Sequence, residues 1–261
     1  MARKVDRPFV WANCALSLDG RLAYANGRPA PLSGPEDLAR VQGIRAAVDA
    51  ILVGSGTVLA DDPSLRVHWE LLGRTPSPAL PVPARVILDS RGRVRPPARV
   101  LDGSIRTVVF TSRSAPGTGS SSAEQVRLGE RNVPLPGALR WLYRNGLRSL
   151  LVEGGTGVMS SFLRGGWVDR FSFFVAPVLL GEGSSPALFS GPPAKGPRTT
   201  LGLKVEGSEP LDGGVLIWGR PRRVRPGAAS PPKLGPEGRP FSPRPGKGVK
   251  TSRRPSGRDG A

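Results

Sequence analysis

The chain has one cysteine, one histidine and no apolar run of the roughly 18 residues that a membrane span needs. Cys14 has no second thiol to pair with, so an internal disulfide is excluded. One cysteine and His68 cannot supply a zinc site of the usual ligand spacing, and we expect no metal site. The charged first residues lack the apolar stretch of a secretory signal, so we expect a soluble, cytoplasmic protein.

Acidic residues are also scarce, with 20 Asp and Glu against 38 Lys and Arg and a net charge of +18. Residues 221–261 carry 11 of the basic residues but only 2 of the acidic ones, together with nine Pro and seven Gly. This composition predicts a disordered basic tail after a body of residues 1–220. Phe241 is the tail's one aromatic residue, and no RNA-binding motif accompanies the charge, so contact with nucleic acid rests on charge alone and is not expected for the body.

Residues 8–220 alternate short apolar runs with amphipathic stretches, which predicts an α/β fold with a central, mostly parallel sheet flanked by helices. We expect strands at 8–16, 50–53, 84–88, 106–110, 149–152, 171–176, 201–205 and 215–218. Helices are expected at about 35–48, 136–145 and 158–164. The first begins with a capping box, in which Ser33 caps the helix and Glu36 reaches back. Residues 119–130 and 181–198 are expected to be irregular, and Gly146 to end its helix in a left-handed conformation.

Two glycine turns follow predicted strands, one at Gly54, Gly56 and Thr57 and the other at Gly154, Gly155 and Thr156. Both place backbone N–H groups beyond the carboxyl ends of the strands, where α/β sheets bind phosphates. Either turn alone could be ordinary turn chemistry.

A hydroxyl and guanidinium cluster, Ser112 and Arg113, follows the predicted strand at 106–110. Such a cluster suits the 2′-phosphate of NADPH, so NADPH is favoured over NADH, which stays possible. Arg113 could equally be an ordinary surface residue.

Carboxylates stand near both turns. Glu153 ends an apolar strand at the mouth of the expected cleft, while Asp19 and Asp62 could simply form turns. A further set could hold a substrate phosphate or could be a mixed charged surface: Arg45, Ser64, Arg66 and His68.

Several motifs together resemble the riboflavin-biosynthesis reductases, in order and at family spacing over about residues 7–220. They are Arg7-Pro8-Phe9-Val10, Leu16-Ser17-Leu18-Asp19-Gly20-Arg21, Asp49-Ala50-Ile51-Leu52-Val53-Gly54, Gly56-Thr57-Val58-Leu59-Ala60-Asp61-Asp62-Pro63-Ser64-Leu65, Arg85-Val86-Ile87-Leu88-Asp89-Ser90, Val152-Glu153-Gly154-Gly155 and Ala176-Pro177-Val178-Leu179-Leu180-Gly181. The family comprises the C-terminal reductase domain of bacterial deaminase-reductases and its stand-alone archaeal and fungal counterparts.

This resemblance implies a dihydrofolate-reductase-like fold, NADPH as hydride donor and a homodimer. The implied substrate is a phosphoribosylaminopyrimidine whose ribose opens to a Schiff base and accepts hydride at C1′. Asp61 and Glu153 would be catalytic, and Asp61 would also lie near the cofactor. The implied cofactor residues are Gly54, Gly56, Thr57, Asp89, Ser90, Gly154, Gly155 and Thr156. The implied substrate residues are Asn13, Ser33, Arg45, Ser64, Arg66, His68 and Glu153.

The sequence departs from the family at two positions: Asn13 replaces the lysine of the bifunctional enzymes, and Pro29 replaces a frequent serine. One cysteine and one histidine cannot form the family's zinc deaminase site, so we expect a reductase alone. Stand-alone members of the family mostly act before deamination, so the resemblance implies 2,5-diamino-6-(5-phosphoribosylamino)pyrimidin-4(3H)-one as the favoured substrate, with the deaminated uracil compound second. Dihydrofolate reduction is less favoured, and a basic nucleic-acid-binding protein is the alternative from another class.

Overall fold

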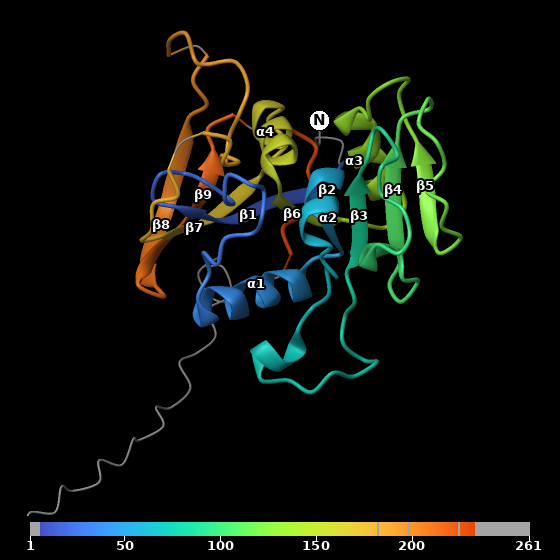
Figure 1. Ribbon diagram of the computed structural model, residues 1–261, viewed down its shortest axis with the longest axis horizontal. Coiled ribbons are helices and arrows are strands. Elements are labelled where there is room, and N and C mark those ends of the chain that lie inside the picture. Colours follow the sequence, from blue (N-terminus) through green and yellow to red (C-terminus); the bar gives the residue numbers. More distant parts are fainter. Residues whose placement is uncertain (1–5, 182, 198, 224, 233–261) are drawn as a thin grey trace, which may run out of the picture.

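The computed structural model describes residues 6–181, 183–197, 199–223 and 225–232. Over these residues the chain forms a sheet of nine strands in the order β5-β4-β3-β2-β6-β1-β7-β9-β8 (Figure 1). The strands are β1 (Phe9–Ser17), β2 (Ala50–Gly54), β3 (Ala84–Leu88), β4 (Thr107–Thr111), β5 (Ala123–Arg127), β6 (Ser149–Gly154), β7 (Arg170–Ala176), β8 (Leu203–Leu211) and β9 (Gly214–Pro221). The pairs from β5 across to β7 are parallel, and β9 runs antiparallel to both of its neighbours, β7 and β8. The expected mostly parallel α/β sheet is confirmed.

Helices cover both faces of this sheet. They are α1 (Pro35–Ala47), α2 (Ser55–Asp61), α3 (Leu135–Arg144) and α4 (Thr156–Arg164), with short 3₁₀ turns η1 (Trp69–Leu72) and η2 (Arg99–Leu101). Leu52 of β2 packs on the side of α3 and α4, whereas Ile51 packs on the side of α1 and α2. Successive strand residues point to opposite faces, so an apolar run such as 50–53 fills both cores at once.

The first helix begins differently from the expected capping box. Its N-cap is Gly34, and no side chain of α1's own segment caps it. Instead Asp212, in the hairpin between β8 and β9, accepts hydrogen bonds from the backbone N–H groups of Glu36 (3.2 Å) and Asp37 (2.7 Å). Ser33 lies one residue too early and donates its hydroxyl hydrogen bond to Asp37. The capping-box prediction is therefore wrong, because a residue remote in sequence takes that role.

The expectation that residues 119–130 are irregular is also wrong in part. Residues 123–127 form β5, which pairs in parallel with β4 at the edge of the sheet. This strand is only half-buried, so its residues Glu124 and Gln125 lack the apolar pattern of a central strand. By contrast, α3 ends as predicted, with Gly146 at φ +85°.

The body continues past the expected boundary at residue 220. Pro221 closes β9, and Arg225 donates a backbone hydrogen bond to Gly166 (2.7 Å). Arg7 pairs with Ala228 in a short parallel bridge, and the Ala229 N–H donates to the Arg7 carbonyl (2.9 Å). These residues are hydrogen-bonded to the body, while residues 233–261 of the predicted tail lie outside the described part of the chain.

Candidate active site

A cleft of about 890 Å³ opens beyond the carboxyl ends of β2 and β6. These strands are neighbours, but the chain leaves β2 toward β3 on one side and leaves β6 toward β7 on the other. Such a switch in direction separates the loops and creates the crevice in which open α/β sheets bind ligands. Eight of the residues proposed from the sequence line it: Gly54, Gly56, Thr57, Asp61, Ser90, Glu153, Gly155 and Thr156.

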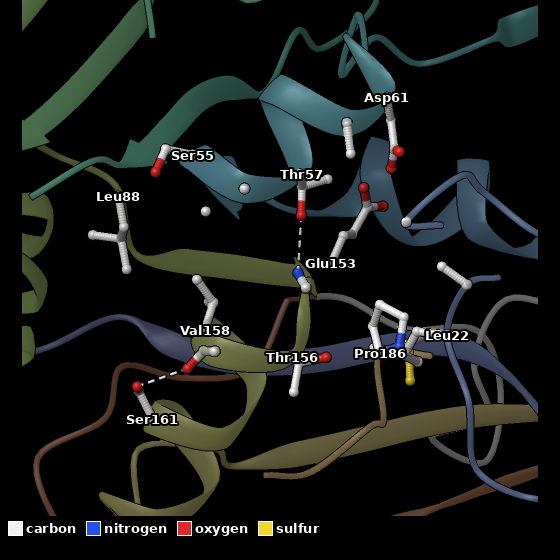
Figure 2. A pocket seen from close by; sticks show the side chains of 18 of the residues that line it. Leu22, Ser55, Thr57, Asp61, Leu88, Glu153, Thr156, Val158, Ser161 and Pro186 are labelled. Carbon is white, nitrogen blue, oxygen red and sulfur yellow. Dashed lines mark hydrogen bonds between the residues drawn. The ribbon is translucent and has the colours of Figure 1, made fainter. Parts of the chain in front are cut away.

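The two glycine turns form one floor of this cleft. The Thr57 hydroxyl accepts a hydrogen bond from the Gly155 N–H (3.0 Å), drawn as a dashed line in Figure 2. A Cβ at Gly54 would lie 2.7 Å from the Val158 side chain, and one at Gly155 would lie 3.1 Å from the Thr57 hydroxyl. Glycine is needed at Gly54 because this close approach of turn and helix leaves no room for a side chain.

Glu153 is held by an arginine of helix α1. Both of its carboxylate oxygens accept hydrogen bonds from Arg45 in α1, from Nε and from one terminal nitrogen, each at 2.7 Å. Burial acts to lower the pKa of Arg45, but the charge and hydrogen bonds of Glu153 outweigh it and raise that pKa. This bidentate pair, largely shielded from water, keeps Glu153 as an oriented carboxylate.

Asp61 is the second carboxylate of the cleft. It ends α2, and Figure 2 shows its carboxyl group and that of Glu153 pointing toward one another. Partial burial raises the pKa of Asp61. No hydrogen bond or ion pair to another described residue holds its carboxyl group, so Asp61 is free to take or release a proton.

The other expected substrate residues lie outside the cleft lining. Asn13 is buried, and its amide oxygen accepts hydrogen bonds from Arg40 (2.9 Å) and Ser172 (2.7 Å). Arg66 pairs with Asp102 (3.0 Å) and His68 with Glu70 (3.0 Å), on exposed surface. Ser33 bonds Asp37, and Ser64 is half-buried.

The remaining expected cofactor residues support the cleft from behind or lie apart from its lining. Gly154 (φ +120°) links β6 to the second turn. Asp89 is fully buried and accepts the Val94 N–H (2.8 Å), while the Ser112 hydroxyl donates to the Ser90 carbonyl (2.7 Å). Arg113 is exposed and does not line the cleft.

Comparison with known proteins bears on this cleft. The sequence model of the RibD C-terminal domain matches residues 8–217. The chain belongs to the RibD C-terminal domain family. It is 40% identical over 191 residues to the 2,5-diamino-6-ribosylamino-4(3H)-pyrimidinone 5′-phosphate reductase of Archaeoglobus fulgidus, covering 71% of this chain and 87% of that protein. Identity is also 40%, over 189 residues, to the Methanothermobacter thermautotrophicus protein of the same name, covering 71% and 85%.

Among solved structures, Acinetobacter baumannii RibD (form 1) matches with a TM-score of 0.72 and 29% identity. The match covers 84% of this chain but only 59% of that protein. These relatives bear out the expected resemblance to riboflavin-biosynthesis reductases, and a reductase of this family implies a nicotinamide cofactor.

The cleft of this RibD-family chain fits such a cofactor. Helix α4 starts at N-cap Gly155 with no side-chain cap, so its first N–H groups stay available to an anion. A Cβ at Gly56 or Gly157 would meet no atom within 4 Å, although both residues line the cleft. The absence of side chains there lets a pyrophosphate approach the backbone closely. Leu88, Val133 and Val158 add an apolar wall for a ring.

Sequence reasoning missed several residues that line the cleft. They are Cys14, Leu22, Ser55, Arg91, Arg93 and Asn132, among others. Arg91 and Arg93 flank a glycine directly after the Asp89-Ser90 motif, and this Arg-Gly-Arg run was a detectable signal. Burial raises the pKa of the Cys14 thiol, so this cysteine stays neutral in the cleft. Within the described part of the chain, every helix is too short or too polar to span a lipid bilayer.

Proposed function

We propose that the chain reduces 2,5-diamino-6-(5-phosphoribosylamino)pyrimidin-4(3H)-one to its ribitylamino product, with NADPH as reductant. The observation that carries this proposal is the pairing of two features in one cleft. Two joined glycine turns offer a cradle for a dinucleotide, and Asp61 and the arginine-held Glu153 stand together at one end. The names of the two relatives at 40% identity favour the diaminopyrimidinone.

The nicotinamide, when bound, supplies a hydride for C1′ of the ring-opened ribose. Gly54, Gly56, Thr57 and the start of α4 at Thr156 would hold its phosphates. Ser90, Leu88 and Val133 would line the path of its other half. Glu153, oriented by its two hydrogen bonds from Arg45, would accept hydrogen bonds from N–H groups of the pyrimidine.

Asp61 would transfer the proton that ring opening requires. Its raised pKa lets the carboxyl group hold a proton at a higher pH than an exposed aspartate does. Leu22 and Pro186 wall this end of the cleft (Figure 2) and would limit the access of water to the reacting carbon. Together these side chains would orient the open-chain imine, with the proton going to the ring oxygen as its bond to C1′ breaks and the hydride going to C1′.

We also propose that Arg45 contributes to holding the substrate phosphate. Three of its five N–H groups are used, two by Glu153 and one by the Arg66 carbonyl (2.9 Å). The other two can donate to an anion without breaking the Glu153 pair. Substrate-binding roles stay predictions for the other five residues, which lie outside the cleft lining: Asn13, Ser33, Ser64, Arg66 and His68. All of them except Ser64 bind other side chains of the protein.

The sheet offers a surface for the predicted homodimer. Leu203 and Val205 of the edge strand β8 and Val215 of β9 are exposed apolar residues on the last two strands at one edge of the sheet. A second copy seated there would bury them. The cytoplasmic location and tail contact with nucleic acid stay predictions from composition.

The test of function is NADPH oxidation by the purified chain with each pyrimidine offered separately. Turnover of the diaminopyrimidinone supports the proposal, and faster turnover of the deaminated uracil compound would replace it with the second candidate substrate. Dihydrofolate serves as the control for the shared fold. If the chain binds NADPH but oxidises none with either pyrimidine, the proposed reaction is contradicted.

A further inference from the structure

The segment of residues 62–68 connects to both carboxylates of the cleft. It leaves directly from Asp61, the last residue of α2. The backbone carbonyl of Arg66 accepts a hydrogen bond from one terminal nitrogen of Arg45 (2.9 Å), whose other donors hold Glu153. The segment itself lies outside the cleft lining. Its position therefore bears on both carboxylates without contact between the segment and a ligand in the cleft.

Two residues of the segment adopt the left-handed backbone conformation, although neither is glycine. Asp62 has φ +38° and Leu65 has φ +49°. Leucine rarely adopts this conformation. The Leu65 side chain is 2% exposed and packs in the core on the side of α1 and α2. Such a backbone persists only where its surroundings fix it, so contacts from outside the segment must hold it in place.

Both ends of the segment are fastened to neighbouring elements. The backbone N–H of Arg99, the first residue of η2, donates to the Asp62 carboxylate (2.8 Å). At the other end, the backbone N–H of His68 donates to the side-chain oxygen of Gln42 in α1 (3.0 Å), and Gln42 is buried. The ends of the segment are thus tied to η2 and to α1.

The middle of the segment is fastened to Asp102, directly after η2. A terminal nitrogen of Arg66 donates to one oxygen of the Asp102 carboxylate (3.0 Å). The other oxygen accepts hydrogen bonds from Arg85 (2.6 Å) and from the Ser104 hydroxyl (2.6 Å). Hydrogen bonds from Arg85 and Ser104 hold the pKa of Asp102 well below its usual range, so the carboxylate stays ionised at neutral pH.

Arg85 in turn fixes Asp102 to the sheet. Arg85 belongs to β3, and its side chain is fully buried. Its Nε and one terminal nitrogen have no hydrogen-bond partner among the described residues, and Asp102 is the described carboxylate that pairs with it. A buried guanidinium needs its counter-charge in place, because an unpaired buried charge is unfavourable. Asp102 is therefore a fixed point to which the half-exposed Arg66 side chain is attached.

We propose that Asp102 is a positioning residue that keeps Glu153 oriented in the cleft. It holds the side chain of Arg66 and thereby the backbone carbonyl of that residue. That carbonyl holds one terminal nitrogen of Arg45, and the other donors of Arg45 hold the two oxygens of Glu153. When the Asp102 contact is lost, the segment can relax and the Arg45 guanidinium can rotate. This inference rests on the proposed function, in which Glu153 binds the pyrimidine.

Arg66→Gln is the first test, because it removes the link to Asp102 and keeps the pair of Asp102 with the buried Arg85. We expect kcat to fall about threefold to tenfold, the effect of one lost hydrogen bond, and the KM of NADPH to stay unchanged. Asp102→Asn should lower kcat at least as far. Arg66→Lys keeps the charge and should restore most of the rate. Wild-type kcat in both Arg66→Gln and Asp102→Asn would overturn the inference.

A direct role of Arg66 in substrate binding predicts a different kinetic result. If Arg66→Gln raised the KM of the pyrimidine and left kcat unchanged, the side chain would bind the substrate itself, and the inference would be overturned. The matched control is Glu124→Gln, which removes an exposed ion pair with Arg106 (3.5 Å) outside the cleft lining. This control should keep the wild-type kcat. An equal fall in kcat there would also overturn the inference, because any lost surface charge would then suffice.

An Arg45→Lys background separates positioning from a general loss of structure. A lysine cannot hold the Arg66 carbonyl and both oxygens of Glu153 with one planar group, so the chain of contacts is already broken. Adding Arg66→Gln to this background should lower kcat no further. A full additional loss would mean that Arg66 acts by another route, and the inference would be overturned.

Urea unfolding separates this inference from the proposed function, because it requires no turnover. The side chains of Arg66 and Glu153 bond to different partners, and Arg45 connects them. The effects of Arg66→Gln and Glu153→Gln on the free energy of unfolding should therefore be non-additive. Such coupling in a chain that reduces neither pyrimidine would support the positioning role while refuting the proposed substrate. Additive effects would overturn the positioning role, whatever the chain reduces.

Discussion

The pair of Arg45 and Glu153 joins residues 108 positions apart through two hydrogen bonds of 2.7 Å. Glu153 was predictable as a cleft residue, because a carboxylate that ends an apolar strand beside a glycine turn must lie at the sheet's ligand-binding edge. Its partner was not predictable, since pairing across that distance depends on how α1 packs on the sheet. The sequence therefore suggested that Arg45 binds a substrate phosphate, whereas in the structure Arg45 chiefly orients Glu153.

Replacing Glu153 by Gln should affect both stability and rate. The amide cannot accept two charge-assisted bonds, and it leaves the largely buried Arg45 without a counter-charge. We expect a loss of about 1.5–3 kcal/mol in the free energy of unfolding and about a hundredfold lower kcat. Urea unfolding and NADPH oxidation measure the two effects. Because Arg45→Gln removes the same pair, a double-mutant cycle that gives no coupling energy would contradict this account.

Asp61→Asn should change how stability depends on pH. Burial raises the pKa of Asp61, so the folded state binds its proton more tightly than the unfolded chain does. Ionisation therefore costs stability as pH rises through the interval from the unfolded to the folded pKa. The variant should equal wild type below this interval and be more stable above it, as thermal unfolding at pH 3 and pH 7 can measure.

The same variant tests the catalytic role of Asp61. An asparagine cannot transfer the proton, so we expect kcat to fall by about 10²-fold to 10⁴-fold. The remaining activity should lose the pH dependence that belongs to this carboxyl group. A wild-type rate with an unchanged pH profile would remove Asp61 from the mechanism.

Among the secondary-structure elements, the buried ones could be predicted from the sequence and the exposed or short ones could not. The central strand β3 was predicted with both of its ends, because its run of apolar residues is filled on both faces. The edge strand β5 was missed, because one-sided exposure lets polar residues occupy it. The short helix α2 was not predicted, since its seven residues begin in the glycine turn and show too little apolar periodicity.

The cap of α1 gives a prediction at this scale. Asp212 has φ +47° and caps the helix from the β8 to β9 hairpin. Asp212→Gly removes the cap without backbone strain and should lower the free energy of unfolding by about 1 kcal/mol. Asp212→Asn keeps an acceptor oxygen and should cost less. Urea unfolding of both variants, measured beside Ser33→Ala, decides which residue caps the helix. A larger loss of unfolding free energy in Ser33→Ala than in Asp212→Gly would support the capping box instead.

At the scale of the whole molecule, the class of fold was predictable but the order of the strands was not. Apolar runs that alternate with amphipathic helices indicate a parallel sheet. The placing of β1 between β6 and β7, and the reversal at β9, depend on long-range pairing that no local pattern encodes. For the same reason the cleft residues contributed by separate segments, Cys14 of β1 and Asn132 ahead of α3 among them, were recognised only once the strands were assembled.

The C-terminal boundary shows how a few specific contacts can outweigh composition. Residues 221–232 are as rich in Pro and Arg as the tail beyond them, yet Arg225 stacks 4.7 Å from the centre of the Trp167 ring and donates to the Gly165 carbonyl (2.7 Å). Arg7, itself buried and paired with Asp169 (2.7 Å), exchanges backbone hydrogen bonds with residues 227 and 229. These contacts make the segment part of the body.

Two truncated chains would separate the segment from the rest of the tail. Ending the chain at residue 232 should leave the melting temperature and NADPH oxidation unchanged, because every contact described above is kept. Ending it at residue 221 removes the Arg225 contacts and the pairing with Arg7, and the loss of several hydrogen bonds should cost about 2–4 kcal/mol. That cost would lower the melting temperature by roughly 4–16 °C. Equal melting temperatures for the two chains would mean that residues 222–232 contribute nothing to the fold, and the composition-based boundary at 220 would then be correct.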